Sequence, residues 1–260
     1  MARLCPLFSG STGNSYYIGT KSSGVLIDVG RSARQVENML KLCGIDPLAV
    51  GGILITHEHS DHISGVRVLA KKYGLPVFAS PGTLRAMAKD LEGIESYVAQ
   101  PGLALASVTV HPFATSHDSA QSLGFRIETE DKRVFTLATD LGYLSDEVKA
   151  HLFESDMAVI ESNHDVQMLR NGGYPMYLKA RILSSRGHLS NAACGEFLPE
   201  LLKSGTRRFL LAHLSRENNT PALARDTALT ALTKAGYVQN VDYMLEVAPP
   251  ENTAGRSILF

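Results

Sequence analysis

The chain has 260 residues, of which 44% are hydrophobic and 20% are charged. This composition is typical of a globular protein with a sizeable core, and it excludes a disordered, collagen-like or coiled-coil chain. With 25 Lys and Arg against 26 Asp and Glu, the formal net charge of −1 gives no sign of a bulk attraction to nucleic acid or membranes. A polyanionic partner would therefore need a local basic face.

The cysteines and the hydropathy pattern bear on the compartment. Cys5, Cys43 and Cys194 lie far apart and form no C-x-x-C pair, so they suggest neither a disulfide framework nor a thiolate zinc site. There is no signal-peptide pattern, and no apolar run reaches the ~18 residues that would span a bilayer. We expect a cytoplasmic protein with no membrane partner, built as one continuous domain over residues 1–260.

The first half of the chain predicts strands with helices between them. Three consecutive antiparallel strands are expected at 3–8, 15–18 and 24–29. Ser32 should then cap a helix that stops at Gly44, and the apolar run 52–56 predicts a buried strand. A helix at 63–73, a strand at 77–79 and a helix from the Ser80 cap to about Leu91 should follow.

The second half predicts the same mixture. Strands are expected at 107–114, 123–130, 133–139, 157–160, 209–212 and 243–247, and helices at 176–183, 191–202 and 221–235, the last two capped by Ser190 and Thr220. Strands with interspersed helices thus occur twice along the chain. This order predicts an α/β protein with two sheets packed face to face and helices on their outer sides.

The run from His57 to His62 concentrates metal-binding side chains directly after a predicted strand. In an extended segment His57 and His59 point the same way and can bind one ion, while Asp61 and His62, where the helix begins, can reach a second. The alternative is a solvated polar loop that caps the following helix.

One short loop cannot complete two coordination spheres, and further candidates follow later strands. His117, Asp140 and His213 each come where a predicted strand ends, which is where open α/β sheets place their sites. Singly, each could be a satisfied strand-end histidine or an aspartate that opens a turn. As a set they supply the missing ligands.

The H-x-H-x-D-H run at 57–62, followed by Gly65, resembles the signature of the metallo-β-lactamase fold, a four-layer αββα sandwich with a binuclear metal site. Further motifs resemble the YycJ/WalJ branch of that family over nearly the whole chain: Ser9 to Asn14, Asp28-Val-Gly30, Ser116-His-Asp118, Thr139-Asp-Leu-Gly142, Glu161-Ser-Asn-His-Asp165, Gly187-His-Leu-Ser-Asn191 and His213 to Asn219. The resemblance implies a 5′-to-3′ exonuclease that acts on double-stranded DNA, with a role in DNA repair or processing.

The resemblance also implies a ligand set. It assigns His57, His59 and His117 to one metal ion, Asp61, His62 and His213 to the other, and Asp140 to both as a bridging carboxylate. Nitrogen and oxygen ligands admit Zn²⁺, Mn²⁺ or Fe²⁺, and the implied nuclease activity suggests Mn²⁺. Two such ions can activate a shared water as the nucleophile, and Asp61 counts as catalytic as well as a ligand.

Residues near the predicted helix at 191–202 are candidates for the remaining chemistry. His188 could give a proton to the leaving group, and Ser190 and Asn191 could bind a phosphate at the helix N-terminus. His164 either orients a ligand or touches substrate, or else belongs to a structural polar cluster. Cys194 is expected to be a core residue.

Charge distribution points to the substrate. Residues 166–195 contain no Asp or Glu, whereas Arg170, Lys179, Arg181 and Arg186 contribute +4. Arg181 and Arg186 are therefore candidate phosphate contacts, although an ordinary solvated helix face often carries as many cations.

Other functions fit the same metal motif. These alternatives are a hydrolase of small esters, thioesters or lactams, an RNA nuclease, and a catalytically silent metal-stabilised binding protein. The sequence leaves the oligomeric state open.

Overall fold

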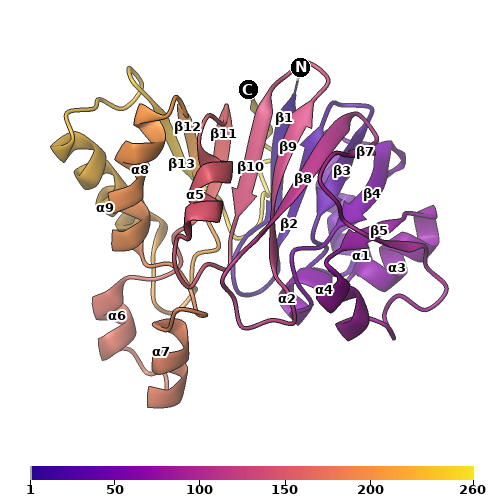
Figure 1. Ribbon diagram of the computed structural model, residues 1–260, viewed down its shortest axis with the longest axis horizontal. Helices are drawn as coiled ribbons and strands as arrows, with labels where there is room; N and C mark the ends of the chain where they lie inside the picture. The colour runs from indigo at the N-terminus through magenta and orange to yellow at the C-terminus, as the bar shows by residue number, and fades with distance from the viewer. Residues whose placement is uncertain (1) are drawn as a thin grey trace. The chain divides into compact units, whose positions relative to one another are not determined.

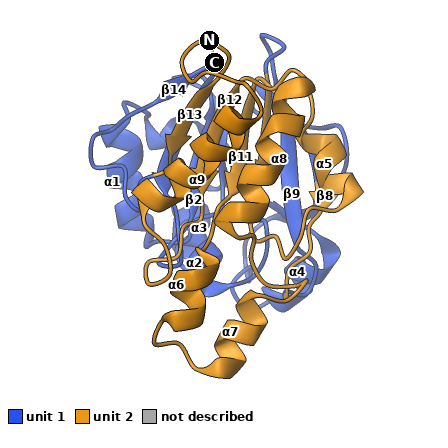
Figure 2. Ribbon diagram, turned by 90° about the vertical axis from the view of Figure 1, so that its left-hand side faces the viewer, with its two compact units in different colours: residues 1–112, 119–133, 249–260 blue, residues 113–118, 134–248 orange. Residues whose placement is uncertain are grey.

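The structure is a computed structural model that describes residues 2–260 (Figure 1). The chain falls into two compact units, of which unit 1 comprises residues 1–112, 119–133 and 249–260, and unit 2 comprises residues 113–118 and 134–248 (Figure 2). The strands form two mixed sheets. A single domain over residues 1–260 stays a prediction.

Unit 1 contains a seven-stranded sheet with the order β14-β1-β2-β3-β4-β5-β6. Its strands are β1 (Arg3–Phe8), β2 (Ser15–Gly19), β3 (Gly24–Ile27), β4 (Val50–Leu54), β5 (Val77–Ala79), β6 (Ser96–Val98) and β14 (Ile258–Leu259). The first three pair antiparallel, as predicted, whereas β3 to β6 run parallel. Because β3 and β4 are parallel, the segments that follow them leave the same edge of the sheet.

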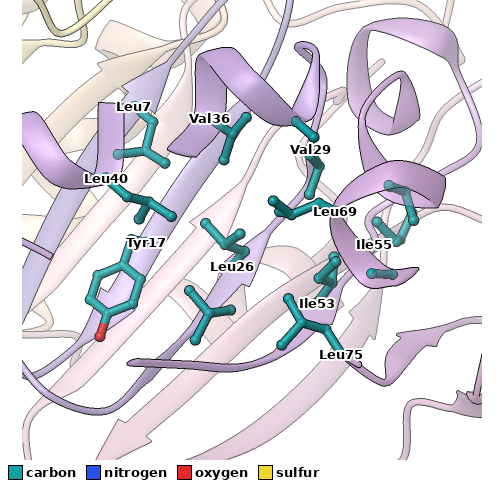
Figure 3. Close-up of a cluster of buried hydrophobic side chains, with 14 of the residues drawn as sticks. Leu7, Tyr17, Leu26, Val29, Val36, Leu40, Ile53, Ile55, Leu69 and Leu75 are labelled. Atoms are coloured by element: carbon teal, nitrogen blue, oxygen red, sulfur yellow. The ribbon is translucent and has the colours of Figure 1, made fainter. Parts of the chain in front are cut away.

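Helices of unit 1 bury one face of this sheet. They are α1 (Ala33–Leu42), η1 (Pro47–Ala49), α2 (Ser60–Ile63), α3 (Val66–Tyr73) and α4 (Pro81–Ala86). Val36 and Leu40 of α1, four residues apart, and Leu69 of α3 lie in one apolar cluster with Leu26 and Ile53 of the sheet (Figure 3). The spacing of the two α1 residues places both on one helix face, so the cluster fixes the helices on the strands.

Three helix predictions in unit 1 need correction. The helix expected at 63–73 begins at Val66 as α3, and the separate short helix α2 precedes it; Gly65, between them, packs so closely on the Arg31 carbonyl that a Cβ would overlap it. Ser32 precedes α1 but does not cap it, since its hydroxyl donates to the Gln35 side chain instead. The helix from Ser80 ends at Ala86 and continues as hydrogen-bonded turns.

Unit 1 also holds three further stretches of strand. These are β7 (Leu103–Leu105), most of β8 (Val108–Ala114) and β9 (Leu123–Thr129). β7, which the sequence did not predict, pairs antiparallel with β8.

Unit 2 carries parallel strands in the order β13-β12-β11-β10. They are β10 (Val134–Ala138), β11 (Met157–Glu161), β12 (Arg208–Ala212) and β13 (Met244–Val247). Its helices are α5 (Asp146–Leu152), α6 (Val166–Asn171), α7 (Met176–Ile182), α8 (Asn191–Lys203) and α9 (Pro221–Lys234). Parallel strands place their carboxyl ends at one edge, where the polar motifs of unit 2 begin.

The helices of unit 2 divide into those that build its core and those that do not. Side chains of α5, α8 and α9 form an apolar cluster with β10 to β13, and it includes Cys194, as predicted. Ser190 and Thr220 accept backbone hydrogen bonds as the predicted caps. α6 and α7 instead project from the body of the unit in both views (Figures 1 and 2). Among residues 2–260, no helix has the length and apolar character needed to cross a membrane.

Candidate metal centre

The loop after β4 holds the histidines of unit 1 close together. The Nε2 atom of His57 lies 3.0 Å from the Nδ1 atom of His59. Donor atoms bound at about 2.1 Å to one tetrahedral ion lie about 3.4 Å apart, so this separation fits two ligands of a single metal. His57 is buried, and its other ring nitrogen lies 3.0 Å from the hydroxyl of Thr56.

Asp28, at the end of β3, orients the last histidine of the loop. One carboxylate oxygen lies 2.8 Å from His62 Nδ1 and accepts the Thr56 hydroxyl, while the other accepts the Thr56 backbone N–H. An anchored Nδ1 leaves Nε2 as the ligand atom of His62, which is the usual arrangement of metal-binding histidines. From the sequence, Asp28 was identified only as part of a motif, and this role was not predicted.

The glycine-rich turn before β2 approaches the same loop. The Asn14 backbone N–H donates to the Asp61 carbonyl at 2.8 Å, and its side-chain nitrogen lies 3.1 Å from His62 Nε2. Gly30 packs against the same carbonyl, where a Cβ would overlap the oxygen. Asn14 and Gly30 together therefore hold Asp61 and His62 in place.

Unit 2 gathers a second set of donors at the ends of three neighbouring strands, β10, β11 and β12, and in the loop before α8. One ligand atom from each of four side chains lies within 4.8 Å of the others: Asp140, Glu161, His188 and His213. Asp140 and His213 have φ values of 58° and 56°, in the left-handed region that non-glycine residues avoid. Such backbone costs of order 1–3 kcal/mol and is concentrated at functional sites.

Glu161 connects the imidazoles of this set. Its Oε1 atom lies 2.8 Å from the Nδ1 atoms of both His188 and His213, and Oε2 accepts the backbone N–H groups of Leu141 and Leu189. Burial alone would raise the pKa of Glu161, but the two imidazoles and these hydrogen bonds outweigh it and hold the pKa below its usual range. From the sequence, Glu161 was identified only as part of a motif and this role was not predicted; its position as the last residue of a buried strand was the available signal.

His117 is anchored in the same manner within unit 2. Its Nδ1 atom lies 3.1 Å from the Gly187 carbonyl, and burial lowers its pKa, which keeps the imidazole in the neutral form that binds metals. Three histidines thus share one arrangement, in which Nδ1 lies near an oxygen atom and Nε2 is the nitrogen that can bind a metal: His62, His117 and His213. The nitrogen and oxygen donors fit a divalent transition-metal ion.

The other predicted site residues have defined places in unit 2. Ser190 Oγ caps α8. Asn191 is buried, and its side chain bonds to Ser162 and Asn219 in a closed polar network. His164 is 1% exposed, and its ring nitrogens have no hydrogen-bond partner among residues 2–260. Burial lowers the pKa of His164 to about 4, so the ring is neutral near pH 7.

Both predicted arginines are engaged at the His117 loop. Arg181 forms a two-pronged ion pair with Asp118, with 3.0 Å between Nη2 and Oδ1, and Arg186 donates to the His117 carbonyl. These contacts place two of the four cations of the basic stretch beside a predicted metal ligand. Their roles toward substrate stay predictions.

Comparison with known proteins identifies the family. The family described as "Beta-lactamase superfamily domain" matches residues 24–214. The chain belongs to the metallo-β-lactamase superfamily. Membership confirms the predicted α/β sandwich of two mixed sheets flanked by helices, and a solved member has the same fold. That structure, the metallo-β-lactamase fold protein YhfI from Bacillus subtilis, has a TM-score of 0.72 at 18% identity and covers 96% of this chain and 97% of its own.

Two superfamily relatives are more similar in sequence. Exodeoxyribonuclease WalJ of Streptococcus pneumoniae is 37% identical over 94% of this chain and 93% of its own. Exodeoxyribonuclease YycJ of Bacillus anthracis is 39% identical over 89% of each chain. Both names agree with the branch predicted from the motifs. This superfamily member is accordingly a hydrolase, and its fold and donor groups indicate that it uses divalent metal ions.

Proposed function

We propose that the protein is a metal-dependent exodeoxyribonuclease that removes nucleotides from the 5′ end of double-stranded DNA. The observation that carries the proposal is the set of anchored imidazole and carboxylate donors in a chain similar, over most of its length, to two relatives named exodeoxyribonuclease. A role in DNA repair or processing belongs to the same proposal.

The proposed centre binds two divalent ions, with Mn²⁺ as the first choice and Zn²⁺ or Fe²⁺ as the others. The ligands are those that the family motif assigns: His57, His59 and His117 for one ion, Asp61, His62 and His213 for the other, and Asp140 for both. The anchored Nδ1 atoms and the short His57 to His59 separation support the assignment. When bound, the ions lower the pKa of a shared water and neutralise charge on the phosphate.

His188 is proposed to supply the proton to the leaving oxygen. Because Glu161 Oε1 lies 2.8 Å from its Nδ1, the proton available for transfer is on Nε2. Arg181 and Arg186 would place positive charge beside the phosphate, and Ser190 and Asn191 would shape the helix end behind it.

We infer a cytoplasmic location for the protein from the state of its cysteines. Cys5, Cys43 and Cys194 are all free and buried, which suits a reducing compartment.

A product ladder from labelled duplexes tests the function. Protein supplied with Mn²⁺ should shorten a 3′-labelled, 5′-phosphorylated duplex stepwise, and Asp140→Asn should abolish the ladder. Asp146→Asn, at an exposed carboxylate in the first turn of α5, is the matched control and should behave as the parent protein.

Parallel assays with other substrates separate the alternative functions. Cleavage of RNA but not of DNA would identify the protein as an RNA nuclease, and turnover of a lactam or thioester without any nuclease activity would identify it as a hydrolase of small molecules. Either result contradicts the proposal.

A further inference from the structure

Residues 166–187, which we call the arm, form an almost coreless projection of unit 2. α6 buries only Leu169 and α7 buries only Ile182, whereas α8 buries seven residues. The first two residues of α7 are among the most exposed large apolar residues described, with Met176 78% and Tyr177 77% accessible. Two adjacent apolar side chains on such a projection indicate a contact surface.

The charge of the arm selects the class of occupant. The arm has no Asp or Glu, and it carries Arg170, Lys179, Arg181 and Arg186. Lys179 Nζ donates to the Arg170 carbonyl at 2.7 Å, which holds the ammonium group beside the end of α6. Arg181 is paired with Asp118, but Arg170, Lys179 and Arg186 form no ion pair with an acidic residue of the arm, which has none. An apolar tip on a support of this charge suits a polyanion with exposed aromatic faces, which describes nucleic acid better than it describes a protein or a lipid surface.

The base of the arm is hydrogen-bonded to residues of unit 2 that the proposed function uses. Arg181 pairs with Asp118, Arg186 donates to the His117 carbonyl, and the Gly187 carbonyl lies 3.1 Å from His117 Nδ1. The His188 backbone N–H donates to the Ile182 carbonyl at the end of α7, at 3.0 Å. The arm is therefore continuous with a predicted metal ligand and with the proposed proton donor.

We propose that the tip of the arm binds the end of the DNA duplex, with Tyr177 stacked on the terminal base pair, Met176 in contact with its edge and Arg170 on a backbone phosphate. The flat face of a base pair is accessible only at an end, and the side chains offered to it are a phenol ring and a thioether. This inference rests on the proposed function, because it names how that enzyme engages its substrate end.

Binding of fluorescent duplexes in EDTA tests the arm without cleavage. Because a base stacks on the aromatic ring, its removal in Tyr177→Ala should raise the dissociation constant about tenfold. Tyr177→Phe keeps the ring and should bind as the parent protein does. Tyr97→Ala, which removes another exposed tyrosine on β6 of unit 1, is the matched control and should also be unchanged.

Two further measurements separate stacking at an end from general affinity. A 2-aminopurine base at the duplex terminus should be quenched by the parent protein and not by Tyr177→Ala, and a dumbbell with both ends closed should bind both proteins equally. Arg170→Gln should reduce the slope of log affinity against log salt by about one.

Equal binding of the open duplex by the parent protein and Tyr177→Ala would overturn the inference and leave the tip to a partner of another class. The failure of the proposed function looks different. In that case the parent protein and the variants would show the expected binding differences in EDTA, but the parent protein would give no product ladder with any of the metals tested.

Discussion

Replacing Glu161 by Gln tests how unit 2 holds its imidazoles. The two oxygens of Glu161 have different partners. Oε2 accepts the backbone N–H groups of Leu141 and Leu189. Oε1 faces the Nδ1 atoms of His188 and His213. In Glu161→Gln the amide oxygen must replace Oε2 to satisfy the buried backbone donors. The amide nitrogen then faces both imidazoles at about the same place.

The magnitude follows from the tautomers. An amide N–H next to each Nδ1 forces the imidazole proton onto Nε2, which is the atom through which His213 should bind metal. Losing such an anchoring partner typically costs 10–100-fold in metal affinity. Two hydrogen bonds to a charged group, at about 1.5–3 kcal/mol each, are also weakened, so the metal-free protein should lose about 3 kcal/mol of stability.

Metal affinity measured by competition with a chromophoric chelator checks this prediction, together with urea unfolding of the metal-free protein. Asp165→Asn is the control, because it makes the same change at a nearby carboxylate that only caps α6 by accepting the Met168 N–H. If Glu161→Gln bound metal as tightly as the parent protein and kept its turnover number, the tautomer argument would be refuted.

Three further changes test other parts of the account. Asp28→Asn should weaken metal binding about tenfold by releasing His62 Nδ1, and an unchanged affinity by the same chelator assay would exclude its orienting role. Burial lowers the pKa of His164 from 6.5 to about 4 in the folded protein. As the pH falls from 6.5 to 4, this imidazole is therefore protonated in the unfolded chain but not in the folded one, and the folded state loses stability over that range. His164→Asn should remove about 3 kcal/mol of this acid-side loss in metal-free protein, as read from urea midpoints at pH 7 and pH 4, whereas a parallel pH dependence would contradict it. Gly30→Ala should lower metal occupancy as well as melting temperature, because its Cβ would displace the Asp61 carbonyl; elemental analysis showing full occupancy would count against this.

The sequence predicts best what a short segment determines by itself. The run from His57 to His62 and the strands around it were evident because hydrophobic runs and metal-binding side chains are local patterns. The caps at Ser190 and Thr220 were equally local. The short helices α5 and α6 were not predicted, although α7, which is equally short, was; six or seven residues give only weak periodicity, so helices of this length are predicted unevenly.

What the sequence did not provide are contacts between distant residues. Asp28 reaches His62 across 34 positions, and Glu161 reaches His188 and His213 across 27 and 52. Nothing local distinguishes these carboxylates from other acids at strand ends. The same holds for the basic stretch at 166–195, because a count of charges does not show that Arg181 is paired with Asp118, 63 residues earlier.

Titration of metal-free protein with Mn²⁺ tests whether bound metal makes this chain a nuclease, with the number of ions bound per chain and the hydrolysis of a 5′-phosphorylated duplex measured together. Hydrolysis should appear as the second ion binds, and EDTA should abolish it. Full hydrolysis by protein shown to contain no metal, or no hydrolysis of any DNA with both ions bound, would contradict the proposed function.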